Sequence, residues 1–93
     1  MLTIWKYPVP VEDHFELSLP IGARPLAVQV QHGNPQMWIL LDKDKDEVLY
    51  IKRRFRIAGT GHLIQESAES LHYIDTFQLL GGNLIFHVFE IEE

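Results

Sequence analysis

The C-terminal stretch from His72 to Ile91 contains two segments rich in aromatic and aliphatic residues, which flank Gly81-Gly82-Asn83. Glycine and asparagine tolerate the positive φ angles that tight turns between strands require. The stretch is therefore predicted to form a β-hairpin. Its second strand places apolar side chains on both faces, with Leu84, Phe86 and Val88 on one and Ile85, Phe89 and Ile91 on the other. Such a strand must be covered twice, so we expect the rest of the chain, or a second copy of it, to pack around the hairpin.

The rest of the chain predicts further short strands, separated by proline, glycine, asparagine and aspartate. Alternating patterns or short apolar runs mark residues 4–7, 14–19, 26–31, 37–41 and 48–57. The turn residues recur about every 8–12 positions, a spacing typical of all-β folds. Only residues 65–70 favour a helical turn, and that turn is short. We therefore expect one all-β domain over residues 1–93, a small antiparallel sandwich or barrel of about seven strands.

The composition narrows the class of protein. The chain of 93 residues is 46% hydrophobic and has no cysteine, which excludes disulfides and thiolate chemistry. It shows no signal-peptide pattern and no apolar run of roughly 18 residues, so we expect a soluble, cytoplasmic protein. Its net charge of −5 argues against binding to long nucleic acids. The surplus of apolar strand faces at residues 37–41 and 84–91 favours a homo-oligomer, the alternative being a closed barrel that buries them internally.

The candidate binding site lies where a basic segment meets a glycine-rich loop. Four of the eight cations fall within Lys52-Arg53-Arg54-Phe55-Arg56, and Gly59-Thr60-Gly61-His62 follows soon after. Backbone N–H groups between two glycines can form an anion-binding nest, to which a threonine hydroxyl, a histidine and arginines add donors. We expect a small anionic ligand to contact Arg54, Arg56, Gly59, Thr60, Gly61 and His62, with the ring of Trp38 as a stacking surface. The plainer interpretation is a glycine turn with the arginines as a solvated edge.

Metal binding and catalysis find little support in the residue pattern. Asp42-Lys43-Asp44-Lys45-Asp46 starts like a calcium loop, but Glu47 and Arg53 replace the glycine and the bidentate glutamate that such a loop needs. The five histidines show no ligand spacing. No serine lies in a nucleophile-elbow context. We therefore expect no metal and no cofactor, and Asp75, set between Tyr73 and Phe77, is the one carboxylate for which burial would be unusual.

The chain resembles a family of small, uncharacterised tailed-phage proteins. The likeness is carried by Ile4–Tyr7, Val28–Gln31, Gly33–Pro35, Trp38, Phe55–His62 and Tyr73–Glu90. It implies a phage-encoded protein that works in the cytoplasm of the host bacterium, and it implies no activity. Leu80 stands where that family has a histidine.

Three functions are consistent with these features. The first is a non-enzymatic phage accessory protein that binds a small anionic ligand, such as a host nucleotide signal, and so counters antiphage defence. The second acts by protein–protein contact, as an inhibitor of a host enzyme or as a virion component. The third, a small hydrolase or isomerase, is disfavoured because the sequence shows neither a nucleophile motif nor metal-ligand spacing.

Overall fold

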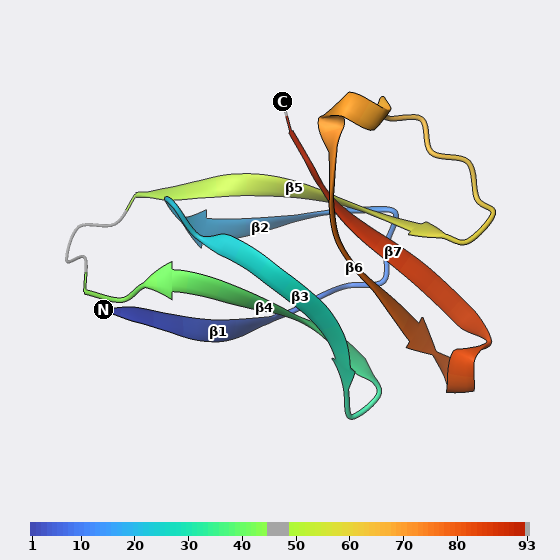
Figure 1. Ribbon diagram of the computed structural model, residues 1–93, viewed down its shortest axis with the longest axis horizontal. Coiled ribbons are helices and arrows are strands. Elements are labelled where there is room, and N and C mark those ends of the chain that lie inside the picture. Colours follow the sequence, from blue (N-terminus) through green and yellow to red (C-terminus); the bar gives the residue numbers. More distant parts are fainter. Residues whose placement is uncertain (45–48, 93) are drawn as a thin grey trace.

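The computed structural model describes residues 1–44 and 49–92 and shows two antiparallel sheets packed face to face (Figure 1). Its elements are β1 (Leu2–Pro8), β2 (His14–Pro20), β3 (Arg24–Gln31), β4 (Asn34–Asp42), β5 (Tyr50–Gly59), β6 (Leu71–Leu79) and β7 (Leu84–Ile91), with single 3-10 turns η1 (Ala68–Ser70) and η2 (Leu80–Gly82). The predicted all-β fold of about seven strands is confirmed, and of the two predicted architectures the structure shows the sandwich and not the barrel. The turn predicted at 65–70 is present as η1, whereas η2 was not expected.

One sheet has the order β1-β4-β3 and the other β2-β5-β7-β6. Hairpins join β3 to β4 and β6 to β7, and the remaining connections change sheet or skip a neighbour. The important consequence is that β5 lies beside β7, with Ala58 opposite His87 and Gly59 opposite Phe86. The glycine-rich loop that follows β5, at the right of Figure 1, is thereby brought next to the first residues of β7, whose hairpin turn with β6 lies at the lower right.

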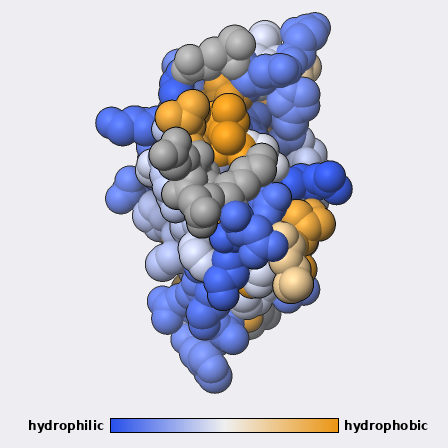
Figure 2. Space-filling view, turned by 90° about the vertical axis from the view of Figure 1, so that its left-hand side faces the viewer, coloured by the Kyte–Doolittle hydropathy of each residue, from blue (hydrophilic) through white to orange (hydrophobic). Residues whose placement is uncertain are grey.

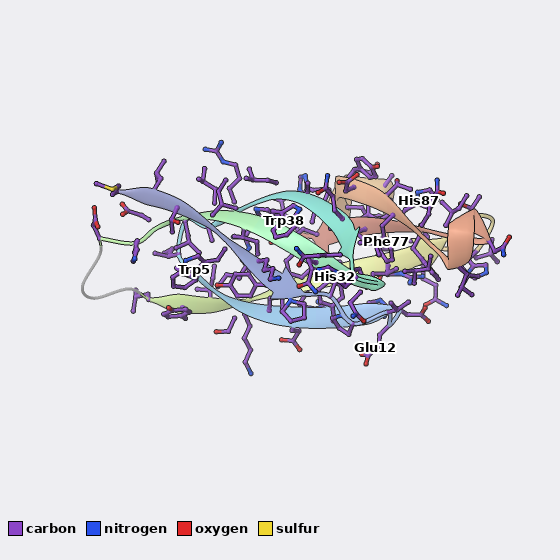
Figure 3. All side chains as sticks on the ribbon, turned by 90° about the horizontal axis from the view of Figure 1, so that it is seen from below. Trp5, Glu12, His32, Trp38, Phe77 and His87 are labelled. Carbon is purple, nitrogen blue, oxygen red and sulfur yellow. The ribbon has the colours of Figure 1, made fainter. Side chains whose placement is uncertain are left out.

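The core lies between the sheets and follows the strand alternation. On β4, Met37, Ile39 and Leu41 are buried and the residues between them point outward. The other sheet contributes Leu19, Phe55 and Val88, all fully buried. The rings of Phe15 and Phe55 stack with centroids 5.0 Å apart across the β2–β5 pair. Figure 3 shows Phe77 between the layers, as its burial requires.

The C-terminal hairpin forms as predicted, but its turn contains a residue that the sequence did not indicate. Gly81 and Gly82 adopt positive φ, and so does Leu80, at φ 52. A branched side chain in this left-handed region costs roughly 1–2 kcal/mol. The surrounding hairpin thus holds Leu80 in a strained conformation, with 70% of its surface exposed.

A carboxylate closes the sandwich where β3 meets β6. Asp75 accepts a hydrogen bond at Oδ2 from the backbone N–H of Val28, at 3.0 Å, and at Oδ1 from its neighbour Thr76, at 2.8 Å. Each of the two strands is the last of its sheet. The β6 register shifts between Tyr73 and Asp75, which marks a bulge at this point. Asp75 therefore has a structural role, since its hydrogen bond to Val28 links the two sheets at their β3 and β6 edges.

Many large apolar side chains are exposed on the surface. Exposed examples at the end where the chain starts are Met1, Leu2, Ile21, Leu49, Tyr50 and Ile51. Figure 2, which faces this end, shows apolar patches set among hydrophilic side chains. No helix in the described part of the chain has the length and apolar character needed to span a membrane.

Candidate functional site

A hollow of about 320 Å³ opens beside the loop that follows β5. Its polar edge consists of Thr60, His62 and Asn83, and its apolar floor of Leu84, Ile85 and Phe86, with Gly59 between them. The described part of the chain places no carboxylate in this lining. On a protein with 13 acidic and 8 basic residues, the hollow is a local exception to the overall negative charge.

The loop is closed by its own backbone hydrogen bonds. The N–H of Thr60 donates to the carbonyl of Ile85 at 3.1 Å, and the N–H of His62 donates to the carbonyl of Gly59 at 3.0 Å. Two of the N–H groups expected to form an anion nest are thus already used. The groups of the loop that a ligand could contact are therefore mainly side chains, the hydroxyl of Thr60 and the imidazole of His62.

Gly59 fixes the position of His62. A Cβ at residue 59 would lie 2.9 Å from both Cε1 and Nδ1 of the His62 ring. The ring therefore packs directly against the backbone of Gly59, in the space that a side chain at position 59 would fill. Gly61 provides the positive φ of 87° that lets the chain turn back.

A chain of hydrogen-bonded side chains crosses the outer face of the sheet and ends at this hollow. The hydroxyl of Tyr73 lies 2.6 Å from that of Thr76, Thr76 Oγ1 lies 3.0 Å from His87 Nδ1, and His87 Nε2 lies 2.7 Å from Thr60 Oγ1. The residues come from β6, β7 and the loop after β5, and Figure 3 shows His87 on β7. A neutral imidazole donates from one nitrogen and accepts at the other, so the direction of one hydrogen bond sets the next.

The arrangement partly matches a nucleophile and its base. A hydroxyl within hydrogen-bond reach of a histidine, which a third group orients, is the geometry of an activated nucleophile. Here the third group is the hydroxyl of Thr76 and not a carboxylate. A hydroxyl does not stabilise the imidazolium that a base becomes during catalysis. The chain is therefore better suited to fixing the orientation of the Thr60 hydroxyl than to activating it.

Arg56, one of the predicted ligand contacts, is only 7% exposed and holds the chain after the loop in place. It donates to the carbonyls of Asp13, Ile57 and Leu63 and, from Nε, to Glu66 Oε1 at 3.0 Å. Glu66 also meets His14 Nε2 at 2.7 Å. The hydrogen bond to His14, joined by that from Arg56, lowers the pKa of Glu66 from 4.5 to about 2. The guanidinium of Arg56 is thus committed to the fold.

The basic segment does not form one cationic stripe. Arg53 points into the sandwich and makes a bidentate ion pair with Glu90, with N–O distances of 2.6 and 2.7 Å. Arg54 is exposed and lines a separate hollow of about 270 Å³ with His14 and Glu16. Arg54 lies five positions before Gly59 on β5, about 16 Å of strand at ~3.3 Å per residue.

Trp38 lies apart from the loop. It sits on the outward face of β4 in the other sheet, and its Nε1 donates to Gln29 Oε1 at 3.1 Å. Figure 3 shows Trp38 and His87 on different strands of different sheets. Of the predicted site residues, the structure brings together Gly59, Thr60, Gly61 and His62 and leaves Arg54, Arg56 and Trp38 elsewhere.

Several site residues were not anticipated from the sequence. Asn83 was assigned only to the turn, and His87 and Thr76 were treated as ordinary strand residues. The signal that finds them is the register of β7 against β5 and β6, which sets His87 between Ala58 and Thr76. A sequence gives the face of a strand residue by its parity, but not the strand beside it.

Metal binding finds no support in the described residues, since no three histidine, aspartate or glutamate side chains among them converge. The aspartate-rich loop considered for calcium extends beyond the described residues at positions 45 and 46.

A second, more apolar hollow of about 510 Å³ lies on the other side of the hairpin tip. Val30, Leu79, Leu80 and Leu84 line it, together with Gly33, Gln78 and Gly81. Leu84 borders both hollows. The tip of the β6–β7 hairpin therefore separates a polar-edged recess from an apolar one.

Comparison with known proteins places the chain in a family. The family model described as a domain of unknown function, DUF7352, matches residues 1–93. The chain belongs to the DUF7352 family. No curated protein and no solved structure matches this DUF7352 domain.

Proposed function

We propose that the protein binds a small anionic molecule in the hollow beside Thr60 and His62, and that it acts by holding this molecule without transforming it. The observation that carries the proposal is the lining itself. Three hydrogen-bonding side chains and an apolar floor, with no carboxylate among the described lining residues, occur on an otherwise acidic protein. Such a lining favours an anion that the rest of the surface would repel.

The shape of the hollow supports a ligand with two parts. Leu84, Ile85 and Phe86 suit a flat apolar portion, and Thr60, His62 and Asn83 suit a phosphate or carboxylate. At about 320 Å³ the recess is at the lower end of the range of ligand sites, so the ligand is about the size of a mononucleotide or presents a part of that size.

The resemblance to tailed-phage proteins suggests what such binding is for. A phage-encoded protein that removes a nucleotide signal from the host cytoplasm would counter a defence pathway that depends on that signal. Binding alone is enough for this purpose, which agrees with a histidine that is oriented by a hydroxyl and not by a carboxylate.

Thermal unfolding in the presence of candidate ligands tests the proposal. The panel is inorganic phosphate, nucleoside monophosphates, and cyclic mono- and dinucleotides. A ligand that binds only the folded state stabilises it by about 2.7 kcal/mol at a concentration of 100 Kd. We expect at least one nucleotide to raise the melting temperature, and chromatography to recover it unchanged.

Two variants tie the effect to the hollow. His62→Ala removes an exposed side chain from the lining and should abolish the ligand-induced shift. Arg54→Ala changes an exposed cation in a different hollow and should leave the shift intact. The proposal fails if no phosphate compound stabilises the protein, or if the His62 variant responds as the parent does.

A second candidate function, contact with another protein, is favoured by the strained Leu80. A bulky residue held at φ 52 and 70% exposed, next to an apolar hollow, is a feature that folding alone does not require. Under this alternative Leu80→Ser would abolish partner binding, while the response to nucleotides, if any, would remain.

A further inference from the structure

Strand β1 is an edge strand with an uninterrupted ladder on one side and, among the described residues, no strand on the other. It pairs only with β4, in a register that runs without a shift from Leu2 opposite Asp42 to Pro8 opposite Gln36. An edge of this kind presents a row of backbone donors and acceptors that fit another strand.

The hydrogen bonds at the two ends of β1 identify which groups face outward. The N–H of Lys43 donates to the carbonyl of Met1, and the N–H of Val9 donates to the carbonyl of Pro35. Odd-numbered residues of β1 therefore belong to the hydrogen-bonded pairs with β4. Because such pairs alternate along an antiparallel ladder, the N–H and C=O groups of Leu2, Ile4 and Lys6 point away from the sheet.

The other sheet edges carry protection that β1 lacks. The β3 edge is interrupted by a bulge after Pro25 and receives Asp75 at Val28. The β6 edge has its own bulge before Asp75. The β2 edge exposes the polar side chains of His14, Glu16 and Ser18. On β1, only Lys6 and the terminal Pro8 oppose strand addition.

The exposed side chains of β1 are mostly apolar. Leu2, Ile4 and Trp5 are 63%, 54% and 45% exposed. Ile4 lies opposite Leu40, a partly buried residue of β4, so the apolar strip continues onto the outer face of the sheet. An occupant of this edge would cover apolar surface as well as satisfy backbone groups.

We propose that β1 pairs antiparallel with β1 of a second copy of the chain, about a two-fold axis at Ile4. This register places Ile4 opposite Ile4 of the other copy, and Leu2 opposite Lys6. It uses all three outward N–H groups, and the even spacing keeps the inner and outer faces of both sheets aligned. Two three-stranded sheets then form one continuous sheet of six strands.

The chemistry of β1 favours its own copy as the occupant. The strand has one charged side chain, Lys6, which meets an aliphatic residue in this register, so no like charges lie opposite one another. Ile4 against Ile4 is a β-branched pair, and Trp5 against Thr3 on the other face pairs an aromatic with a β-branched residue. A two-fold contact is also the commonest way in which identical chains associate.

Solution mass measurement tests this inference, with proline as the probe. The parent should have about twice the chain mass of 10.8 kDa. Ile4→Pro removes an N–H that serves only the outer edge, so it should give a monomer whose melting temperature in dilute solution is close to that of the parent. Thr3→Pro removes an N–H that faces β4 and should destabilise the fold, which confirms the assigned directions.

A second variant guards against misfolding of the proline protein. Ile4→Lys sets two like charges against each other at the axis and should also give a monomer. The inference is overturned if the parent is monomeric at the highest soluble concentration, or if folded Ile4→Pro or Ile4→Lys remains a dimer.

Discussion

The hydroxyl of Thr60 and the Nε2 of His87 lie 2.7 Å apart, although 27 positions separate them in the sequence. The contact joins the loop after β5 to the middle of β7, and Thr76 meets the other imidazole nitrogen at 3.0 Å. The hydroxyl of Thr60, a residue that lines the hollow, is therefore held in a defined direction.

Removing this hydroxyl tests its contribution to ligand binding. Thr60→Val keeps the shape of the side chain but breaks the hydrogen bond to His87, at a cost of about 1 kcal/mol in unfolding free energy. Thr60→Ser keeps the hydroxyl and should retain ligand affinity. Calorimetric titration with the best nucleotide from the panel compares the two, and equal affinities for valine and serine would contradict a role for the hydroxyl.

The two glycines of the loop should respond differently to alanine. Gly59→Ala sets a Cβ 2.9 Å from the His62 ring, so it should displace this ring and weaken ligand binding. Gly61→Ala meets no atom within 4 Å but strains the backbone at φ 87, so it should cost about 1 kcal/mol of stability. Urea unfolding and ligand titration on both variants separate these effects. Similar losses of affinity at both positions would argue against a specific role for the His62 packing.

The buried arginine of β5 should matter far more for stability than its exposed neighbour. Arg56→Met leaves Glu66 without its guanidinium and the carbonyls of Ile57 and Leu63 without this donor, and should cost about 3–5 kcal/mol. Arg54→Met alters an exposed position and should stay within about 0.5 kcal/mol. Denaturant unfolding of the pair measures the contrast. Equal stabilities would show that Arg56 does not anchor the segment.

Acid should weaken the protein through Glu66. Its folded pKa lies at about 2, below the ordinary 4.5, so the stabilisation is complete above pH 4.5 and is lost as the pH falls through 2. Glu66→Gln has no charge to lose, so its melting temperature should depend less on pH in that window than the parent's. Parallel melting curves for the two proteins between pH 4.5 and 2 would exclude this contribution.

The carboxylate of Asp75 should be replaceable only by another acceptor. Asp75→Ala leaves the N–H of Val28 without its partner and should cost about 1–3 kcal/mol. Asp75→Asn keeps one oxygen and should cost less. Hydrogen exchange at the Val28 amide reports the bond directly, and unchanged protection in the alanine variant would contradict the assignment.

The sequence predicts the strands well because their period of two is a local property. Alternation in 14–19 and the apolar run at 37–41 identified β2 and β4, and the glycines at 81 and 82 identified the last turn. Only part of the candidate site was predicted, because only part of it depends on local sequence. The loop at Gly59–His62 is visible locally, whereas Asn83 and His87 depend on β5 lying next to β7.

Burial explains what the sequence could not reveal about the arginines. Alternation placed Arg54 and Arg56 on one face, correctly, but that face is covered at Arg56 by residues 63–66, which have no strand or helix pattern. The two arginines thus differ because of an irregular segment that returns over one of them. Side-chain periodicity carries no information on such a segment.

The contact between Asp75 and Val28 also has a mechanical meaning. It links the two sheets along β3 and β6, whereas on the opposite side β1 and β2 are joined through the chain segment 9–13. We expect a larger core side chain, or a molecule bound between the layers, to be accommodated by separation of β1 from β2 and not by loss of the hydrogen bond between Asp75 and Val28. A larger side chain in place of Leu19, on β2, should thus be tolerated better than one in place of Phe77, on β6.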